Sequence, residues 1–228
     1  MSDVAGTAAT AAASAVAGRF CSPSMVNHAR RTYAWGTMYA ATHGIEFDDE
    51  LLQVCALLHD VGLTEAFDSH RLPFEESGGH VAWVVGVAAG WPPARAARAT
   101  DIIVRHMGAD VSPDIDPESF LLQVATSWEV VGRHPGAFGE DAASAVLRRY
   151  PRLEFGPEFL ARFQDQAARH PACAAAASVR NDLAGRMAAN PLARRSPSPV
   201  GTSAAARAVT RPRAWRRPGE GATRRSAG

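Results

Sequence analysis

The chain shows the apolar pattern of a helical protein from Ser22 to about Asn190. Apolar residues in this stretch recur every three or four positions, the spacing that places them on one face of an α-helix. No stretch of convincing length alternates between apolar and polar residues as a β-strand would. The pattern therefore predicts an all-α fold. Its glycine, proline and capping residues divide it into predicted helices over residues 24–43, 48–62, 77–89, 93–106, 117–131, 141–149, 157–169 and 172–189.

Composition divides the 228 residues into three segments. Residues 1–21 are rich in alanine, residues 22–190 form the predicted helical domain, and residues 191–228 are rich in arginine, proline and serine. The last segment holds nine arginines and one acid and lacks apolar periodicity, so we expect a disordered basic tail on a mildly acidic body. Its single aromatic residue, Trp215, favours a solvated tail over a nucleic-acid contact.

Composition also excludes several classes of protein. All 24 basic residues are arginines, which excludes a Schiff-base or P-loop lysine mechanism. The three cysteines are widely spaced, which argues against a disulfide framework and a thiolate zinc finger. No stretch approaches the about 20 strongly apolar residues of a membrane span, and the alanine-type apolarity of residues 1–19, without a basic start, argues against a signal peptide. We expect a cytoplasmic protein that does not bind membranes, and the sequence is compatible with a homo-oligomer.

Two polar residues interrupt the most apolar predicted helix at its end. His59 and Asp60 follow the apolar run 54–58 and precede Gly62. Burying an unpaired carboxylate is costly, so a buried Asp60 requires a compensating partner. A divalent cation would bind the imidazole nitrogen and the carboxylate oxygen together. The alternative is a His–Asp pair that caps the helix or forms local hydrogen bonds.

Three further polar residues lie within apolar helices or at their ends. His28 lies near the start of the first predicted helix, His106 ends an apolar run, and Glu129 interrupts an otherwise core-like helix. With His59 and Asp60 they come from four predicted helices, and helix bundles commonly build inward-facing metal sites in this way. Each histidine alone is more often a hydrogen-bonded core residue. The joint pattern favours a shared metal ion.

In this order, these residues resemble the HD-domain superfamily of metal-dependent hydrolases, and within it the cyanamide hydratase-type proteins. That superfamily is all-helical and is named for its central His-Asp pair. The likeness spans about residues 22–134. The family motifs are matched by Asn27-His28-Ala29-Arg30-Arg31, by Leu57 to Gly62, by Phe74-Glu75-Glu76-Ser77-Gly78, by the helix ending at His106, and by Thr126 to Gly132 except for its acid.

The resemblance implies a divalent metal ion bound by His28, His59, Asp60 and Glu129. Zinc is preferred, and iron, manganese and nickel stay open. Glutamate stands at 129 where the family places aspartate, so ligation through this longer side chain requires a backbone shift or a bidentate mode.

The resemblance also implies three catalytic residues, His106, Glu75 and Arg31. His106 would donate a proton, anchor the substrate or bind a second metal, and Glu75 would orient the substrate or support the metal ligands. Arg31 would pair with a metal-site carboxylate or hold an anion.

The implied function is an enzyme that activates water to hydrate or hydrolyse a small molecule, converting a nitrile to a urea-type product as cyanamide hydratases do. Two alternatives stay open. One is an HD phosphohydrolase that acts on a nucleotide or phosphomonoester. The other is a non-catalytic metal-binding regulatory domain.

Overall fold

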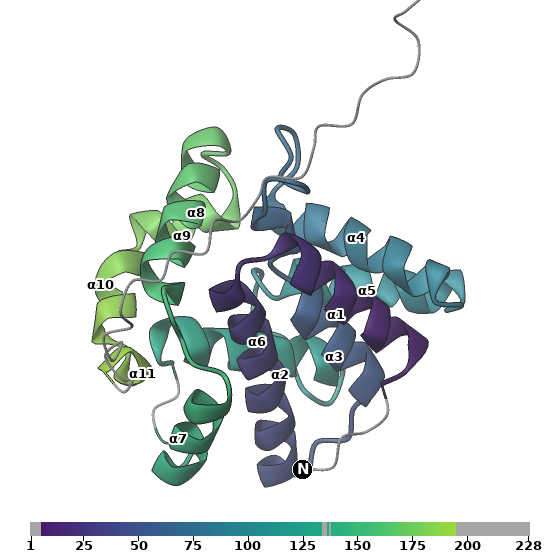
Figure 1. The fold of residues 1–228 in the computed structure, drawn as a ribbon, viewed down its shortest axis with the longest axis horizontal. Coiled ribbons are helices and arrows are strands. Elements are labelled where there is room, and N and C mark those ends of the chain that lie inside the picture. Colours follow the sequence, from purple (N-terminus) through teal and green to yellow (C-terminus); the bar gives the residue numbers. More distant parts are fainter. Residues whose placement is uncertain (1–5, 134–135, 137, 195–228) are drawn as a thin grey trace, which may run out of the picture. The chain divides into compact units, whose positions relative to one another are not determined.

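The computed structural model describes residues 6–133, 136 and 138–194, and every regular element in them is helical. This confirms the predicted all-α fold. The elements are α1 (Ala8–Phe20), α2 (Pro23–His43), α3 (Asp49–Leu58), the 3-10 helix η1 (Val61–Leu63), α4 (Phe74–Ala88), α5 (Pro93–Arg105), α6 (Pro117–Val131), α7 (Glu140–Arg149), α8 (Phe155–Arg169), α9 (Ala174–Arg180), α10 (Leu183–Ala189) and α11 (Pro191–Arg194) (Figure 1).

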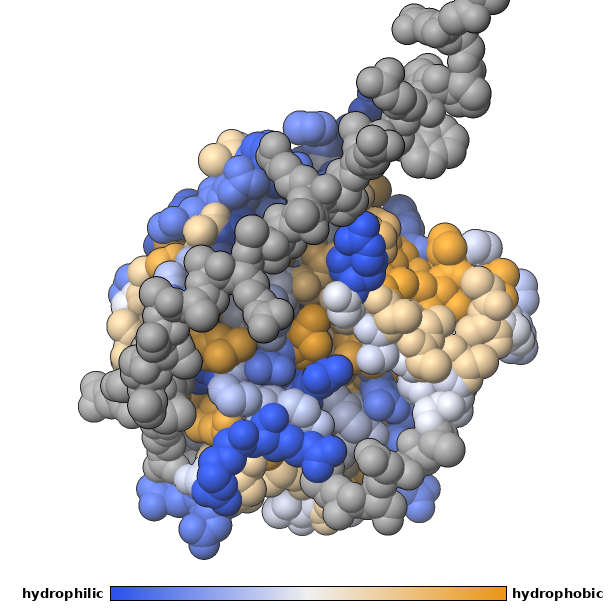
Figure 2. Space-filling view, in the orientation of Figure 1, coloured by the Kyte–Doolittle hydropathy of each residue, from blue (hydrophilic) through white to orange (hydrophobic). Residues whose placement is uncertain are grey.

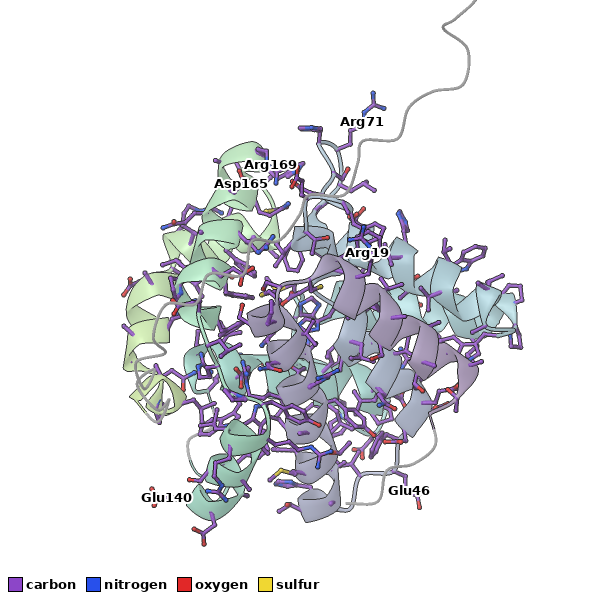
Figure 3. All side chains as sticks on the ribbon, in the orientation of Figure 1. Arg19, Glu46, Arg71, Glu140, Asp165 and Arg169 are labelled. Atoms are coloured by element: carbon purple, nitrogen blue, oxygen red, sulfur yellow. The ribbon has the colours of Figure 1, made fainter. Side chains whose placement is uncertain are left out.

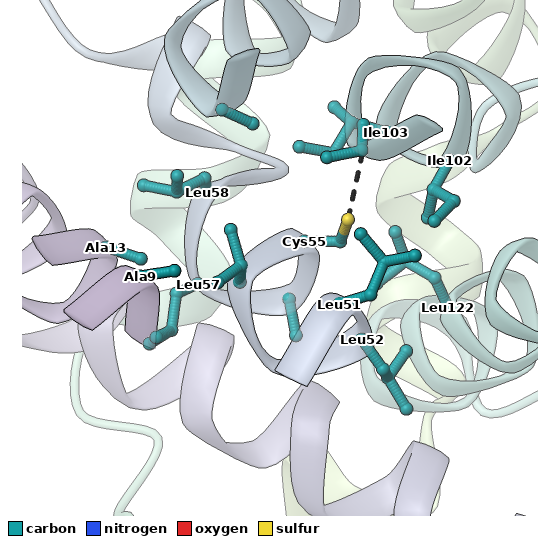
Figure 4. Close-up of a cluster of buried hydrophobic side chains, with 14 of the residues drawn as sticks. Ala9, Ala13, Leu51, Leu52, Cys55, Leu57, Leu58, Ile102, Ile103 and Leu122 are labelled. Atoms are coloured by element: carbon teal, nitrogen blue, oxygen red, sulfur yellow. Dashed lines mark hydrogen bonds between the residues drawn. The ribbon is translucent and has the colours of Figure 1, made fainter. Parts of the chain in front are cut away.

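Helix α3 lies at the centre of the fold, where α1, α2, α4, α5 and α6 all pack against it. Every side chain in residues 54–58 is buried, as expected for a helix that is apolar on all sides. Figure 4 shows this core, in which the thiol of Cys55 donates a hydrogen bond to the carbonyl of Ala99 on α5. The central position of α3 carries His59 and Asp60, which follow it directly, into the interior of the protein.

The alanine-rich N-terminal segment is part of this core. Residues 1–21 were expected to stand apart from the helical domain, but they include α1, whose first turn is capped by the side chain of Thr7. Ala9, Ala13 and Ala17 recur every four residues and are buried, and α1 packs against α3 and α4. Alanine is the strongest helix former, and its methyl group lets helices approach closely. The predicted domain boundary at residue 22 is therefore too late.

Two glycines bring the start of α4 against the turn that holds Asp60. A Cβ atom on Gly62 would overlap the backbone carbonyl of Phe74, and one on Gly78 would lie 3.0 Å from the carbonyl oxygen of His59. Gly62 therefore requires the absence of a side chain, and a side chain at Gly78 would force its neighbours to move slightly. Helix α4 begins at Phe74, three residues earlier than predicted, which places Glu75 in its first turn.

Helices α8, α9 and α10 build a second apolar cluster. Phe155, Phe159 and Phe163 recur every four residues along α8 and are buried, while α8 packs on α2 and η1 and α10 packs on α6. The single helix predicted over 172–189 is two helices, because the backbone of Asp182 turns into the left-handed region with φ 54°. The Asp182 side chain then caps α10.

The last described helix, α11, extends the helical domain beyond its predicted end at residue 190. Asn190 is fully buried, and its side-chain amide donates hydrogen bonds to the carbonyl oxygens of Trp128 and Glu129, at 3.2 Å and 3.0 Å. Leu192 is also buried. The predicted start of the tail, at residue 191, is therefore too early. The remaining residues of the predicted tail, 195–228, lie outside the described residues.

The surface of the described part is mixed in character. Charged side chains such as Glu46 and Arg71 extend outward (Figure 3). On the viewed face apolar residues gather over α4 (Figure 2), where Trp83, Val84 and Val87 are exposed. Among the described helices, none combines the length and apolar character needed to span a bilayer.

We predict that Gly62→Ala destabilises the protein by about 1–3 kcal/mol, because the added methyl group forces α4 away from η1. Gly18→Ala is the matched control, since a Cβ atom there meets nothing within 4 Å and alanine favours the helix by up to about 1 kcal/mol. Urea denaturation of both variants measures the difference. Equal stability of Gly62→Ala and the wild type would show that this close approach is not needed.

Candidate metal centre

Three buried polar side chains meet where α2 passes the end of α3. His28 comes from α2, His59 caps the C-terminus of α3, and Asp60 connects α3 to η1. Their exposed fractions are 1%, 1% and 7%. One ligand atom from each residue lies within 4.8 Å of the others, so this group could hold a metal ion.

The spacing of the three ligand atoms suits a single small cation. The two imidazole Nε2 atoms are 3.1 Å apart, and each lies 3.2 Å from Oδ2 of Asp60. Bonds of about 2.1 Å, at angles of about 90–110° around one ion, separate neighbouring ligand atoms by about 3.0–3.4 Å. The triangle of atoms therefore has the size that a bound divalent ion requires.

Hydrogen bonds on the far side of His59 fix which nitrogen carries its proton. Its Nδ1 lies 2.9 Å from the carbonyl oxygen of Ala56, which can only accept, so Nδ1 is the donor and Nε2 presents a lone pair. Nδ1 of His28 faces the Glu129 carboxylate at 3.8 Å, which favours the same tautomer. Oδ2 of Asp60 has no hydrogen-bond partner. Three lone pairs thus converge, and a cation fits between them.

The charges of the cluster keep the Asp60 carboxylate ionised. Burial would raise the pKa of Asp60, but His59 and His28 beside it hold that pKa well below its ordinary value. Burial would lower the pKa of His59, but the Asp60 carboxylate outweighs burial and raises it. Asp60 therefore stays ionised, as a metal ligand must be.

Glu129, the fourth predicted ligand, lies outside this cluster. It is fully buried on α6. Oε1 accepts hydrogen bonds from Nε of Arg31 at 2.9 Å and from Nη1 of Arg152 at 2.8 Å, and Oε2 accepts one from Nε1 of Trp35 at 2.8 Å. Burial would raise the pKa of Glu129, but the two arginines lower it far below its ordinary value. Both oxygens of this carboxylate are occupied by protein donors.

Arg31, predicted to act in catalysis, does not line the cavity at the cluster. Its side chain is fully buried. Nε and Nη2 contact Glu129, and Nη1 donates to the carbonyl oxygens of Tyr150 and Pro151 at 2.9 Å and 3.0 Å. Of the two roles that the sequence left open, the structure shows the pairing with a carboxylate. Its guanidinium is buried away from the cavity, so it does not face a substrate there.

His106 lies beside the cluster at the end of α5. It is buried, and its ring packs edge-on against His59 with centroids 5.1 Å apart. Nδ1 donates to the carbonyl of Ile103, so Nε2 is left as the free nitrogen. Burial and the neighbouring His59 lower the pKa of His106 to about 4.

Glu75 is buried in the first turn of α4, but it does not line the same cavity. Its Oε2 has no hydrogen-bond partner, and burial raises its pKa.

A cavity of about 210 Å³ opens beside the cluster and is lined by His28, His59, Asp60 and His106. Apolar side chains from α6, α8 and α10 form much of its wall, and α6 adds three uncharged polar groups. Other lining residues are Phe159, Phe163, Val130, Leu183, Gln123, Thr126, Ser127, Arg133 and Arg186. The cavity therefore joins a polar end at the cluster to a wall of mixed apolar and polar side chains.

Several residues of this site escaped sequence analysis. Arg152 lies between predicted helices and carries no periodic signal, although its side chain is only 5% exposed. Phe155 stacks on the His28 ring at 4.4 Å with an interplanar angle of 19°, yet a helix with phenylalanine every fourth residue is equally typical of ordinary core. Residues such as these are recognised only once the helices are placed in space.

The helical fold and the buried cluster together define an all-α protein with a candidate metal site in its core. Residues 25–128 match the model of the HD domain family, in agreement with the resemblance seen in the sequence. Two proteins of Saccharomyces cerevisiae, cyanamide hydratase DDI2 and cyanamide hydratase DDI3, are each 26% identical to this chain over 151 residues. The match covers 64% of this chain and 67% of each yeast protein.

We predict that Glu129 makes the fold sensitive to acid. Its pKa in the folded protein is far below the ordinary 4.5, so it stabilises the fold above that pH and loses this contribution as the pH falls. In urea denaturation with a chelator present, the unfolding free energy of Glu129→Gln should decrease less between pH 5 and pH 3 than that of the wild type. Glu46→Gln, at an exposed position, should keep the wild-type profile. Parallel profiles for Glu129→Gln and the wild type would contradict this assignment.

Proposed function

We propose that this protein is a metal-dependent HD-domain enzyme that adds water to a small molecule, with a nitrile-type substrate preferred. The observation that carries the proposal is the convergence of three buried lone pairs, 3.1–3.2 Å apart, at the end of a cavity. The match to two yeast cyanamide hydratases supports the choice of substrate.

In this proposal His28, His59 and Asp60 hold the metal ion, with zinc preferred. A divalent ion bound there supplies Lewis acidity, which polarises a substrate group and lowers the pKa of water. Neighbouring residues of the protein hold the two histidine rings in place. The Ala56 carbonyl fixes the ring of His59, while Phe155 packs flat on His28 and restricts its rotation.

We assign proton transfer to His106. Its ring lines the cavity, and its Nδ1 is committed to the Ile103 carbonyl, which leaves Nε2 to accept a proton or a hydrogen bond. Because burial and His59 lower its pKa to about 4, the imidazole is neutral at pH 7 and acts first as a base. A general base of this kind contributes about 10²- to 10⁴-fold to a rate.

The cavity limits the substrate by size and polarity. It holds about 210 Å³, against the about 30 Å³ that a water molecule occupies in the liquid. A compact substrate and water therefore fit together. The apolar side chains of Phe159, Phe163 and Leu183 in its wall favour a small neutral group over an extended polar one.

A second candidate function is phosphoester hydrolysis. Arg133 and Arg186 line the same cavity and are exposed, and arginine is suited to binding phosphate. Arg133 lies 3.7 Å from Asp110, which is itself exposed. This pair of arginines is the observation that favours an anionic substrate.

A substrate panel separates the two functions. Metal-loaded full-length protein is incubated with cyanamide and other small nitriles, and with nucleotides and phosphomonoesters. We expect urea-type product from a nitrile and no phosphate. Phosphate release alone would select the second function, and no turnover of either class would favour a regulatory metal-binding domain.

Variants of the two central histidines separate metal binding from chemistry. We predict about one divalent ion per chain in the wild type, lost together with activity in His59→Ala. His106→Ala should keep its metal but lose about 10²- to 10⁴-fold in kcat. His43→Ala is the matched control, because His43 is exposed and bonds only to the carbonyl of Tyr39 in its own helix. Metal analysis by mass spectrometry and steady-state kinetics provide the two measurements. Loss of metal in His106→Ala would instead make His106 a ligand.

A further inference from the structure

We infer that Glu129 is a positioning residue and that the metal centre takes three donors, His28, His59 and Asp60, from the described part of the chain. This inference rests on the proposed function, since it concerns the same metal ion. It differs from the ligand set that the sequence resemblance implies, in which the carboxylate at 129 binds the metal directly.

The strongest argument is the balance of buried charge around Glu129. Arg31 is fully buried and the side chain of Arg152 is 5% exposed, and both guanidinium groups contact Oε1 of Glu129 at 2.8–2.9 Å. This carboxylate is the only acid with which either arginine forms an ion pair within the described residues. Turning Glu129 toward a metal ion would leave two buried cations without a counter-charge, which is strongly unfavourable. The arginines therefore keep Glu129 in place.

The orientation of α6 gives the same answer independently. The face of this helix that lines the cavity carries Gln123, Thr126, Ser127 and Val130. Glu129 is not on that face. Its side chain reaches Arg31 and Trp35 on α2 instead. The Trp35 indole donates to Oε2 at 2.8 Å, so both oxygens already accept hydrogen bonds from residues outside the cluster.

Glu129 acts on the cluster through His28. Its Oε1 lies 3.8 Å from Nδ1 of that ring, and Nδ1 has no closer hydrogen-bond partner. A carboxylate that faces Nδ1 of a metal-binding histidine keeps the proton on Nδ1. The lone pair of Nε2, which faces the metal, then binds the metal more strongly. Phe155 stacked on the ring limits the other directions in which it could turn.

This arrangement changes the charge of the site. Asp60 is the one acidic donor in the cluster, so a divalent ion there would keep a net positive charge. Glu129 and its two arginines add another net positive charge behind His28. A site of this kind favours water and electron-rich substrates at the open side that faces the cavity.

Cobalt(II) tests the inference without relying on activity, because its visible absorption reports the number and type of ligands. Cobalt is titrated into full-length wild type, Glu129→Gln and Asp60→Asn, two variants that make the same carboxylate-to-amide change. We expect Glu129→Gln to keep the position and shape of the wild-type band but to bind cobalt about 10- to 100-fold more weakly. Asp60→Asn should alter or abolish the band.

Two results would overturn the inference. One is a band in Glu129→Gln that changes as it does in Asp60→Asn, which would make Glu129 a ligand. The other is unchanged cobalt affinity, which would remove its positioning role. A wild type that binds no cobalt would instead overturn the proposed function, and this inference with it.

If Glu129→Gln does not fold, a crystal structure of the metal-loaded wild type tests whether Glu129 binds the metal. We expect the contacts of Glu129 with Arg31 and Arg152 to be kept. A Glu129 oxygen within about 2.2 Å of the metal would reject the inference.

Discussion

The contact of the buried Asp60 carboxylate with two imidazole nitrogens, each 3.2 Å away, is the interaction on which most of the surrounding structure depends. An ionised group can be kept inside a protein only if other charges or donors compensate it. The neighbouring elements are arranged to bring those partners close. The last five residues of α3 are all apolar and buried, and the helix lies at the centre of the fold. Gly62 then lets α4 close over the turn after Asp60.

A second buried acid, Glu129, is compensated in a different way. Asp60 is bordered by two imidazole rings, and its Oδ2 has no hydrogen-bond partner. Glu129 is bordered by two guanidinium groups and an indole, which occupy both of its oxygens. The two carboxylates thus differ in what they can still bind. One retains capacity for a cation, and the other is a fixed part of the scaffold that supports His28.

The sequence predicted the helices most accurately where local signals were strong. The helix predicted over 117–131 matches α6, because a capping aspartate, a proline and a following glycine mark its ends. His59 and Asp60, which the structure brings together with His28, were singled out because they interrupt an apolar run, and His28 because it lies near the start of another predicted helix. α1 was missed because its buried alanines do not stand out in a segment where alanine is the commonest residue. The partners of Glu129 were missed for another reason. Pairing between a carboxylate on α6 and Arg152, which lies before α8, depends on how distant helices pack, and no local pattern records that.

The cavity draws its walls from two parts of the chain. The residues at its polar end, His28, His59, Asp60 and His106, all lie inside the span 25–128 that matches the family. Part of the remaining wall comes from α8 and α10, beyond that span. Substitutions in these C-terminal helices can therefore change the shape and polarity of the cavity without altering the four residues at its polar end.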